Sequence, residues 1–399
     1  MLDVPILGRV ALGYSPFIDR NRAVVATRLT VLPLQREVPL DVAELLQAVA
    51  TVWPPSGGRV SLNVASESLL ADLLNGQPAA NVMVEVPSFM ASDVTNVKPI
   101  QALNARGNVL LLQGRPRAEL PREVLNCFKY AIIDVSDDRR SQLGAMVPPG
   151  VTRSIQHVQS GVRTLTEMNS AFDRGAAAVL GWPIEDVLTA GGAARPAQSD
   201  LQVIVTLMQQ LDAGEDPPVL EATLKRDPAL AFKLLRFINS PAFGLRVEVS
   251  SFSHAIMLLG TQRLKRWLAL LLATASKDPN LRPVMFAAVR RGVLMEELVR
   301  PLGDEALRNE MFVCGVFSLL DRMFQQPFAD LFATIPVAEP VRLALVEHAG
   351  PCQPYLHLVN TVESGHLFDL HAAAEALVMS VAEVNAALMR ALSSASQLE

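Results

Sequence analysis

Four of the six histidines lie in the last part of the chain, and imidazole side chains can hold a metal ion. They are His348, His357, His366 and His371. A compact zinc site needs ligands at short, characteristic spacings, whereas these histidines are nine, nine and five positions apart. We therefore interpret them as separate surface or core residues and predict no metal site there.

The other reactive residue types are also scattered. Cys127, Cys314 and Cys352 are far apart, odd in number and form no CxxC pair, which argues against a disulfide framework. Ser56 and Ser318 lack the signature of an activated nucleophile. No phosphate-binding motif follows the glycine pairs. From these patterns we predict no catalytic, cofactor-binding or metal-binding residues and no bound cofactor.

The composition limits the class of protein. A chain of 399 residues suits two domains, and with half of its residues apolar and only 19% charged it should be folded. The 35 basic and 40 acidic residues leave a net charge of -5 without a basic stripe, which argues against nucleic acid as a ligand. No apolar run is long enough to span a membrane, and no signal peptide is evident. We expect a cytoplasmic protein.

The first half of the chain alternates short apolar runs with segments of helical spacing. Strands are predicted at 24–26, 60–64, 81–86, 108–112 and 131–135, and helices at 42–51, 66–74 and 122–128. This alternation predicts a parallel α/β sheet or barrel. About 190 residues is short for a (β/α) barrel, so we expect a trimmed barrel over residues 1–190.

The second half has a different pattern. Residues 191–199 are small and flexible and are predicted to form a linker. Beyond it, Asp216–Pro217 and Asp227–Pro228 each place a capping acceptor before a proline at the first helical position. Leu259–Gly260 is expected to end a helix. These signals predict an all-α domain over residues 200–399.

One motif in the first half points to a family. The string SPFIDRNR at 15–22 resembles the opening QPIFDRNR of EAL domains, which are cyclic-di-GMP phosphodiesterases, and weaker similarity extends to about residue 190. The resemblance implies an EAL-type barrel that, in active members, holds two divalent ions with carboxylates and one Asn at the strand ends. Such ions prefer oxygen ligands, activate water and stabilise the phosphoryl charge.

Matched residue by residue to that family, most metal-binding positions have changed. Asn63 and Glu85 keep a ligand type, but the Glu of the EAL signature falls on Arg28. Other ligand positions fall on Ser88, Gln113, Gly114, Gln156 and Gln159, the Lys before Asp134 falls near Ile132, and the final QG becomes Leu180–Gly181. The resemblance therefore implies a degenerate barrel, in which Asn63, Glu85 and Asp134 are polar groups satisfied by their neighbours.

The second half resembles the HDOD family, which is related to HD phosphohydrolases but lacks their metal ligands. The matching strings are LKRDPAL at 224–230, KLLRFINS at 233–240 and SFSHAI at 251–256. Where HD enzymes carry an adjacent His-Asp pair, this chain has Ser318 and Leu319. Asp321 lies two residues beyond Leu319, which is about 200° around a helix. The resemblance therefore implies that the HD site is absent.

Three functional hypotheses follow. The resemblances imply a non-catalytic bacterial signalling adaptor or regulator that acts through protein–protein interaction. A second hypothesis is a catalytically inactive cyclic-di-GMP receptor, with Arg28 and Arg115 as positive charges at the strand ends. The third, an enzyme with an unrecognised site, has no supporting pattern.

The expected partners are proteins that bind the helical domain. The expected contact surfaces are the segment Ala242–Ser253 and the helix that carries Arg263, Lys265 and Arg266. Those three charges fit an ordinary solvated helix face equally well.

Overall fold

The computed structural model describes residues 4–35, 38–116, 119–137, 155–186, 199–238, 252–276, 278–365 and 369–395. The chain divides into two compact units. The first contains Met1–Asp186, Arg282–Phe286 and His357–Glu399, and the second contains Val187–Leu281 and Ala287–Leu356. Among the described residues, no helix combines the length and the apolar character needed to cross a membrane.

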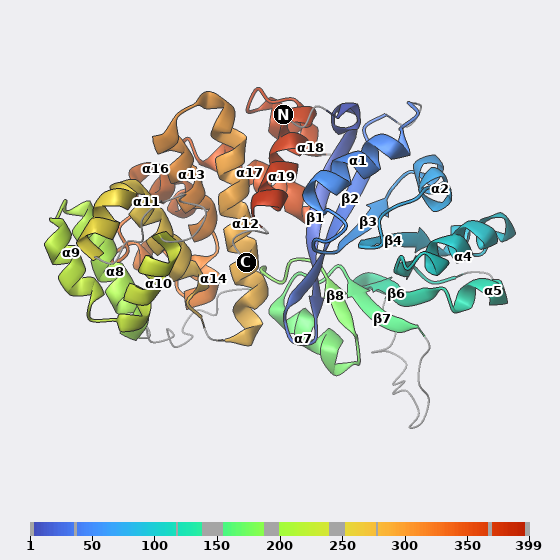
Figure 1. The fold of residues 1–399 in the computed structure, drawn as a ribbon, viewed down its shortest axis with the longest axis horizontal. Helices are drawn as coiled ribbons and strands as arrows, with labels where there is room; N and C mark the ends of the chain where they lie inside the picture. The colour runs from blue at the N-terminus through green and yellow to red at the C-terminus, as the bar shows by residue number, and fades with distance from the viewer. Residues whose placement is uncertain are drawn as a thin grey trace. The chain divides into compact units, whose positions relative to one another are not determined.

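The first unit is built on a closed barrel of eight strands (Figure 1). The strands are β1 (Val10–Asp19), β2 (Val24–Pro33), β3 (Val60–Val64), β4 (Val82–Pro87), β5 (Leu110–Gln113), β6 (Phe128–Asp134), β7 (Gln156–Ser160) and β8 (Ala178–Leu180). From β2 to β8, each strand is parallel to the next one. Strand β1 runs antiparallel to both β2 and β8. The predicted α/β barrel is confirmed.

The five predicted strand segments fall on β2 to β6, but β1, β7 and β8 were not predicted as strands. Gly13 and Pro16 interrupt the apolar pattern of β1, and both residue types are depleted in strands. Strand β7 is rich in polar residues, and β8 spans only Ala178–Leu180. Pairing around the closed barrel, a long-range effect, therefore overrides weak local propensity at these three strands.

Helices cover the outside of this barrel, and Figure 1 shows α1, α2 and α4 along its outer side. The helices of the first half are α1 (Val42–Val52), α2 (Glu67–Asn75), α3 (Ser88–Ala91), α4 (Val97–Ala105), α5 (Arg122–Leu125) and α7 (Leu165–Asp173), with short 3-10 helices η1 (Pro5–Gly8), η2 (Val94–Asn96) and η3 (Val135–Asp137). The helices predicted at 42–51 and 66–74 are confirmed as α1 and α2. The helix predicted at 122–128 ends at Leu125, because the β-forming residues from Phe128 onward begin β6.

The end of the chain returns to the barrel. Helices α18 (Leu370–Glu375) and α19 (Val381–Ala395) belong to the first unit. Asn385 on α19 is fully buried; its side-chain oxygen accepts from the Leu12 amide at 3.2 Å, and its amide donates to the carbonyls of Leu7 and Val10, both at 2.7 Å. Helix α19 thus covers the part of β1 that β8 leaves unpaired, since β8 pairs only with Phe17–Asp19.

This arrangement differs from a linear division of the chain into two domains. The boundaries 1–190, 191–199 and 200–399 remain a prediction about which segments fold independently. Residues 187–198, which include nearly all of the predicted linker, lie outside the described residues.

The second unit is helical throughout its described residues. Its helices are α8 (Ser199–Asp212), α9 (Pro217–Leu224), α10 (Pro228–Ile238), α11 (Phe252–Thr274), α13 (Glu305–Phe317), α14 (Leu320–Phe324), α15 (Phe328–Leu331) and α16 (Glu339–Val346), with η5 (Pro279–Leu281) and η6 (Arg300–Leu302); α12 (Arg282–Val299) and α17 (Gln353–Ser364) contribute residues to both units. The predicted helical domain is confirmed.

Of the two Asp–Pro capping signals in this unit, one forms the expected side-chain hydrogen bond and the other does not. Asp227 accepts from the Leu230 amide at 3.0 Å, as expected for a cap of α10, whereas Asp216 precedes α9 without a side-chain hydrogen bond to it. Gly260 interrupts α11 with a φ of 72°, which confirms the predicted break after Leu259. Glycine tolerates this positive φ without strain.

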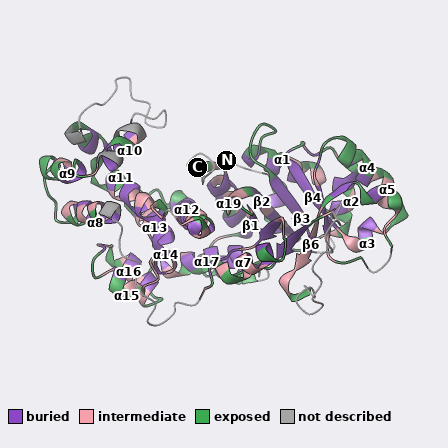
Figure 2. Cartoon of the chain, turned by 90° about the horizontal axis from the view of Figure 1, so that it is seen from below, coloured by how far each residue is buried: buried purple, intermediate pink, exposed green. Residues whose placement is uncertain are grey.

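Helices α12 and α13 cross very closely through two glycines. A Cβ on Gly315 would lie 2.6 Å from the backbone carbonyl of Arg291, and a Cβ on Gly292 would lie 2.9 Å from the Phe312 carbonyl oxygen. Side chains buried around this crossing include Phe312 and Val316, and Figure 2 shows buried residues on these helices. The crossing fixes the carboxyl-terminal part of α13, next to Ser318.

Candidate functional site at the carboxyl ends of the barrel strands

A layer of polar side chains lies above the apolar centre of the barrel. Ala26, Met83, Leu111, Ile132 and Val158, from five different strands, meet in one buried cluster. Successive side chains of a strand point to opposite faces, so the residues two positions further along also face the interior. These residues are Arg28, Glu85, Gln113, Asp134 and Ser160. Gln113, Asp134 and Ser160 are the last residues of their strands, at the edge where (β/α) barrels place their active sites. Glu85 lies two residues before the end of β4, and Arg28 lies midway along β2.

Arg28 and Glu85 form the centre of this layer. The Arg28 Nε donates to Glu85 Oε1 at 2.8 Å, and a terminal nitrogen of Arg28 donates to Oε2 at 2.6 Å. The Glu85 side chain is completely buried and that of Arg28 is 15% exposed. Ser61, which is in register with Arg28, also donates to Glu85 Oε1 at 3.0 Å. Both carboxylate oxygens are therefore occupied by donors from this chain, in a two-pronged, charge-assisted pair.

Asn63 lies on β3, two residues after Ser61, and its side chain forms hydrogen bonds with two other side chains of the barrel. Its side-chain amide donates to Thr30 Oγ1 at 3.3 Å, and its oxygen accepts from Gln113 Nε2 at 3.4 Å. Gln113 stands at a position where the family pattern has an aspartate. Its amide forms a neutral hydrogen bond with Asn63.

Asp134 ends β6 and has its own donors. Its Oδ1 accepts from the amide and the hydroxyl of Ser136, at 3.0 and 2.7 Å, and its Oδ2 accepts from Ser160 at 3.2 Å. A Cβ on Gly161 would lie 2.5 Å from Asp134 Oδ2, so glycine is needed beside this carboxylate. Within the described residues, no group of three or more His, Cys, Asp or Glu side chains could hold a metal ion.

The structure does not place Gln156 and Gln159 in the polar layer. Gln156 begins β7, at the opposite end of the strand. Gln159 faces away from the barrel interior; its amide donates to the Ile133 carbonyl at 2.8 Å and its oxygen contacts His157 Nε2 at 3.2 Å. Ser160, in register with Asp134, holds the interior position. The sequence match at β7 was wrong in register, and a one-residue shift moves a strand side chain to the other face.

The remaining matched positions lie around the same edge. Ser88 begins α3 and donates to the Arg115 carbonyl at 3.1 Å, while Gly114 has a φ of 78°. Ile132 and Leu180 are part of the apolar cluster below the polar layer. Arg115 is exposed, unlike Arg28. Of the two arginines expected to supply positive charge at the strand ends, only Arg115 is exposed to solvent.

In the second unit, Ser318, which the sequence comparison matched to the His of the HD pair, contacts Arg291. Buried Ser318 accepts from an Arg291 guanidinium nitrogen at 3.1 Å and donates to the Gly315 carbonyl at 2.7 Å. Asp321 is 7% exposed, and its Oδ2 is 3.3 Å from Arg322 Nε. Burial raises the pKa of the Asp321 carboxyl, and the charges of Arg322 and Arg291 oppose that shift. Sequence reasoning missed Arg291, because this residue lies on α12 and reaches Ser318 only through the packing of α12 against α13.

The histidines do not come together as a site. His348, His357 and His371 are exposed, and His366 lies outside the described residues. The described residues contain no metal-ligating group to which they belong.

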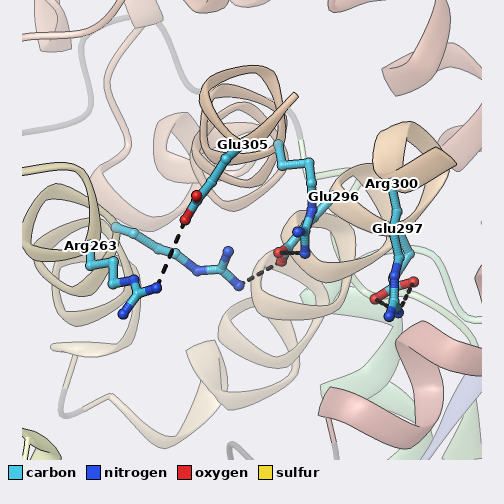
Figure 3. Close-up of polar contacts among 7 residues, drawn as sticks. Arg263, Glu296, Glu297, Arg300 and Glu305 are labelled. Atoms are coloured by element: carbon cyan, nitrogen blue, oxygen red, sulfur yellow. Dashed lines mark hydrogen bonds and ion pairs between the residues drawn. The ribbon is translucent and has the colours of Figure 1, made fainter. Parts of the chain in front are cut away.

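The basic side chains of α11 are paired within the unit. Arg263 lies 3.9 Å from Glu305, Lys265 is bonded to Asp212, and Arg266 lies 2.5 Å from Glu296. Glu296 also accepts from Arg308 at 2.8 Å, and the Arg266 guanidinium stacks 3.9 Å from the centre of the Phe312 ring. Figure 3 shows the Arg263–Glu305 contact and the ion pairs of Glu296 beside the Arg300–Glu297 pair. These pairs favour the interpretation of a solvated helix face over a charged contact surface. The segment 239–251, which makes up most of the other expected surface, lies outside the described residues.

Comparison with protein families identifies one part of the chain. Residues 199–326 match the HDOD domain, and the predicted HDOD domain is confirmed there. The chain is 29% identical over 144 residues to CdgJ of Vibrio cholerae, a cyclic di-GMP phosphodiesterase, covering 36% of this chain and 33% of that protein. It is 28% identical over 160 residues to YuxH of Bacillus subtilis, an uncharacterised protein, covering 38% of each. The chain thus matches only 33% to 38% of the length of these relatives.

Solved structures similar to this chain include EAL domains. One is a standalone EAL protein from Vibrio cholerae with bound c-di-GMP, at 14% identity and a TM-score of 0.31, covering 44% of this chain and 91% of that one. Another is the EAL domain of DcpA from Mycobacterium smegmatis, at 18% identity and a TM-score of 0.30, covering 44% and 92%.

Proposed function

We propose that this chain is a non-catalytic cytoplasmic signalling adaptor, with a degenerate EAL-type barrel joined to an HDOD domain. It carries signals through contacts with other proteins and hydrolyses no cyclic dinucleotide. The observation that carries this proposal is the buried Arg28–Glu85 pair, which occupies the centre of the polar layer.

The energetics of this pair disfavour a metal ion. To coordinate a metal, Glu85 would have to release Arg28, and breaking one side of a buried ion pair costs about 3–5 kcal/mol. A divalent ion about 4 Å from the remaining guanidinium would be repelled by about 8 kcal/mol at an effective dielectric near 20. Two Asp positions of the family are Gln113 and Gly114, so no other carboxylate compensates there. Water would therefore lack the metal that activates it.

A hydrolysis assay tests the proposal. The full chain is incubated with cyclic di-GMP and either Mg²⁺ or Mn²⁺, and linear product is followed by chromatography. We expect no product above a no-protein control. Because several ligand positions have changed together, Arg28→Glu should also show no turnover. Steady turnover by the unmodified chain that stops on addition of a chelator would contradict the proposal.

Support for protein contacts comes from the helical unit. Ser318 and Leu319 are matched to the His-Asp pair of HD enzymes, and Ser318 is bonded to Arg291. The helical unit would therefore act through its packed surfaces rather than as a hydrolytic centre. Phe232 on α10 and Met257 on α11 are each 63% exposed. Large exposed apolar side chains are a common feature of protein interaction sites.

Partner capture by the full chain tests this contact. The variants Phe232→Ser and Met257→Ser should lose captured partners that the wild-type chain retains. Leu302→Ser, at a residue 62% exposed on η6, serves as the matched control and should retain them. Partners that depend instead on residues of the barrel would place the functional surface in the first unit.

The alternative function is a cyclic-di-GMP receptor that binds without hydrolysis. It is favoured by Arg115, whose exposed side chain lies just beyond Gln113 at the carboxyl end of β5. Titration calorimetry with cyclic di-GMP distinguishes the two functions. Binding that weakens in Arg115→Gln would support the receptor, whereas absence of binding by the wild-type chain would support the adaptor.

A further inference from the structure

The turn between β1 and β2 has a backbone conformation that arginine rarely adopts. The Arg22 amide donates to the Asp19 carbonyl at 3.0 Å, and the Asp19 amide donates to the Ala23 carbonyl at 2.9 Å. Arg22 has a φ of 63°, in the left-handed region where turns normally place glycine or asparagine. Residues held in such a strained conformation cluster at binding and switch regions of proteins. The turn is therefore a candidate binding surface.

Helix α7 fixes the Arg22 side chain. A terminal nitrogen of Arg22 donates to Asn169 Oδ1 at 2.6 Å, and the guanidinium carbon lies 4.4 Å from the centre of the Phe172 ring. The other terminal nitrogen donates to the Arg20 carbonyl at 2.9 Å. Arg22 thus ties the turn to α7 and acts as a positioning residue for its neighbours.

Two further arginines lie at the same turn with exposed side chains. A terminal nitrogen of Arg20 donates to the Phe172 carbonyl at 2.9 Å. Arg282, which begins α12 and belongs to the first unit, donates to the Asn21 carbonyl at 3.2 Å. Each guanidinium is oriented by a neutral carbonyl oxygen, and among the residues that the structure describes neither one forms an ion pair. Two oriented positive charges therefore meet solvent at one turn.

The local charge differs in sign from that of the whole chain. Asp19 and Asp173 act on the Arg22 charge, and Asp19 Oδ1 also accepts from the amides of Asn21 and Ala23 at 2.8 and 2.9 Å. The net charge of the chain is -5, which repels an extended anionic surface such as a lipid bilayer or nucleic acid. A short acidic segment interacts mainly with the charges within a Debye length, about 8–10 Å. The turn therefore suits a short segment.

We propose that the turn at residues 19–23, together with Arg282, is a docking site for a short acidic segment of a partner protein. Arg20 and Arg282 each bind one carboxylate of that segment, in the two-pronged geometry that guanidinium and carboxylate groups favour. The carbonyl bonds orient both side chains before the partner binds, so less side-chain entropy is lost. The site lies on the first unit, whereas α10 and α11 belong to the second, and it does not depend on whether the barrel hydrolyses a cyclic dinucleotide.

Fluorescence anisotropy of the full chain with a fluorescein-labelled hexaglutamate peptide tests the proposal. We expect saturable binding that weakens as the salt concentration rises, and no binding of the matching hexaglutamine peptide. Arg20→Gln and Arg282→Gln should each weaken binding about two- to fivefold, as expected for exposed ion pairs, and together roughly tenfold. Both positions are exposed, so the thermal unfolding of these variants should match that of the wild-type chain.

Arg106→Gln is the matched control. Arg106 follows α4, is also exposed, and also donates to a backbone carbonyl, that of Gly76 at 2.7 Å. This variant should bind the hexaglutamate peptide as the wild-type chain does. Absence of binding by the wild-type chain, or an equal loss in all three single variants, would overturn the proposal. Binding to vesicles of phosphatidylcholine and phosphatidylserine but not to the peptide, lost in the double variant, would overturn it in favour of a lipid surface.

Discussion

Replacing Asn385 with Ala should weaken the barrel through a residue that lies at the opposite end of the chain. Asn385 is fully buried and joins α19 to three backbone groups of the first strand region, at Leu7, Val10 and Leu12. Alanine keeps the helix but removes all three side-chain hydrogen bonds. The Leu12 amide and the two carbonyls then lose their Asn385 contacts in a region without solvent.

The expected magnitude follows from the number of bonds. An intramolecular hydrogen bond contributes about 1 kcal/mol net, and stranding a buried polar group costs about 1–3 kcal/mol. Three lost bonds therefore predict a destabilisation of roughly 3–5 kcal/mol. For a unit of this size, each kcal/mol lowers the Tm by about 2–4 °C, which predicts a fall of roughly 6–20 °C.

Calorimetry of the full chain measures the Tm, and hydrogen exchange locates the effect. Exchange should accelerate at β1, whose edge α19 covers. The matched control is Ser394→Ala, an exposed position on the same helix, which should change stability by less than about 0.5 kcal/mol. A Tm for Asn385→Ala equal to that of the control would refute the conclusion that α19 is part of the barrel unit.

Other changes test the remaining contacts. Glu85→Gln should lower the free energy of unfolding by about 3–5 kcal/mol, because it leaves the Arg28 charge without its partner; denaturant unfolding measures this, and a loss below about 1 kcal/mol would contradict it. Gly315→Ala should destabilise the helical unit by about 1–3 kcal/mol through overpacking against Arg291, whereas unchanged thermal unfolding would show that the crossing adapts. Burial raises the pKa of the Asp321 carboxyl above its value in the unfolded chain. Asp321 therefore stabilises the fold at acidic pH, and this contribution is lost as the pH rises from the ordinary Asp range through the raised pKa. Asp321→Asn should remove this pH dependence from the free energy of unfolding, and an unchanged stability–pH profile would refute the raised pKa of Asp321. Protease should cut first within residues 191–199, where small residues and a proline predict an exposed linker; the two fragments should stay associated on gel filtration because residues 357–399 belong to the barrel unit, and immediate separation would contradict this.

More of the fold than of the candidate site could be predicted from the sequence. Apolar runs located β2 to β6, and Gly260 marked the break in α11, because both signals are local. Strand β1 depends on its pairing with β8, and the contact of Asn385 with Leu12 joins the two ends of the chain; no local pattern encodes either one.

The candidate site was likewise predicted in part. The sequence comparison matched Arg28 to the Glu of the EAL signature, and the structure adds that the Arg28 charge is paired with Glu85. Gln156 and Gln159 were matched to metal-binding positions, but neither lies in the polar layer. Successive side chains of a strand point to opposite faces, and the barrel pairs Ser160 with Asp134. The Arg291–Ser318 hydrogen bond was not predicted, because it joins residues from different helices.

Binding of Mn²⁺ to the full chain, followed by electron paramagnetic resonance, tests the central claim most directly. Because Arg28 holds both oxygens of Glu85, the spectrum should show only free aqueous Mn²⁺ at concentrations that fill a two-metal carboxylate site. Arg115→Gln, at an exposed arginine on the same edge, should give the same spectrum. Stoichiometric binding by the wild-type chain that disappears in Glu85→Gln would contradict the account, because it would show that the barrel has kept its metal centre.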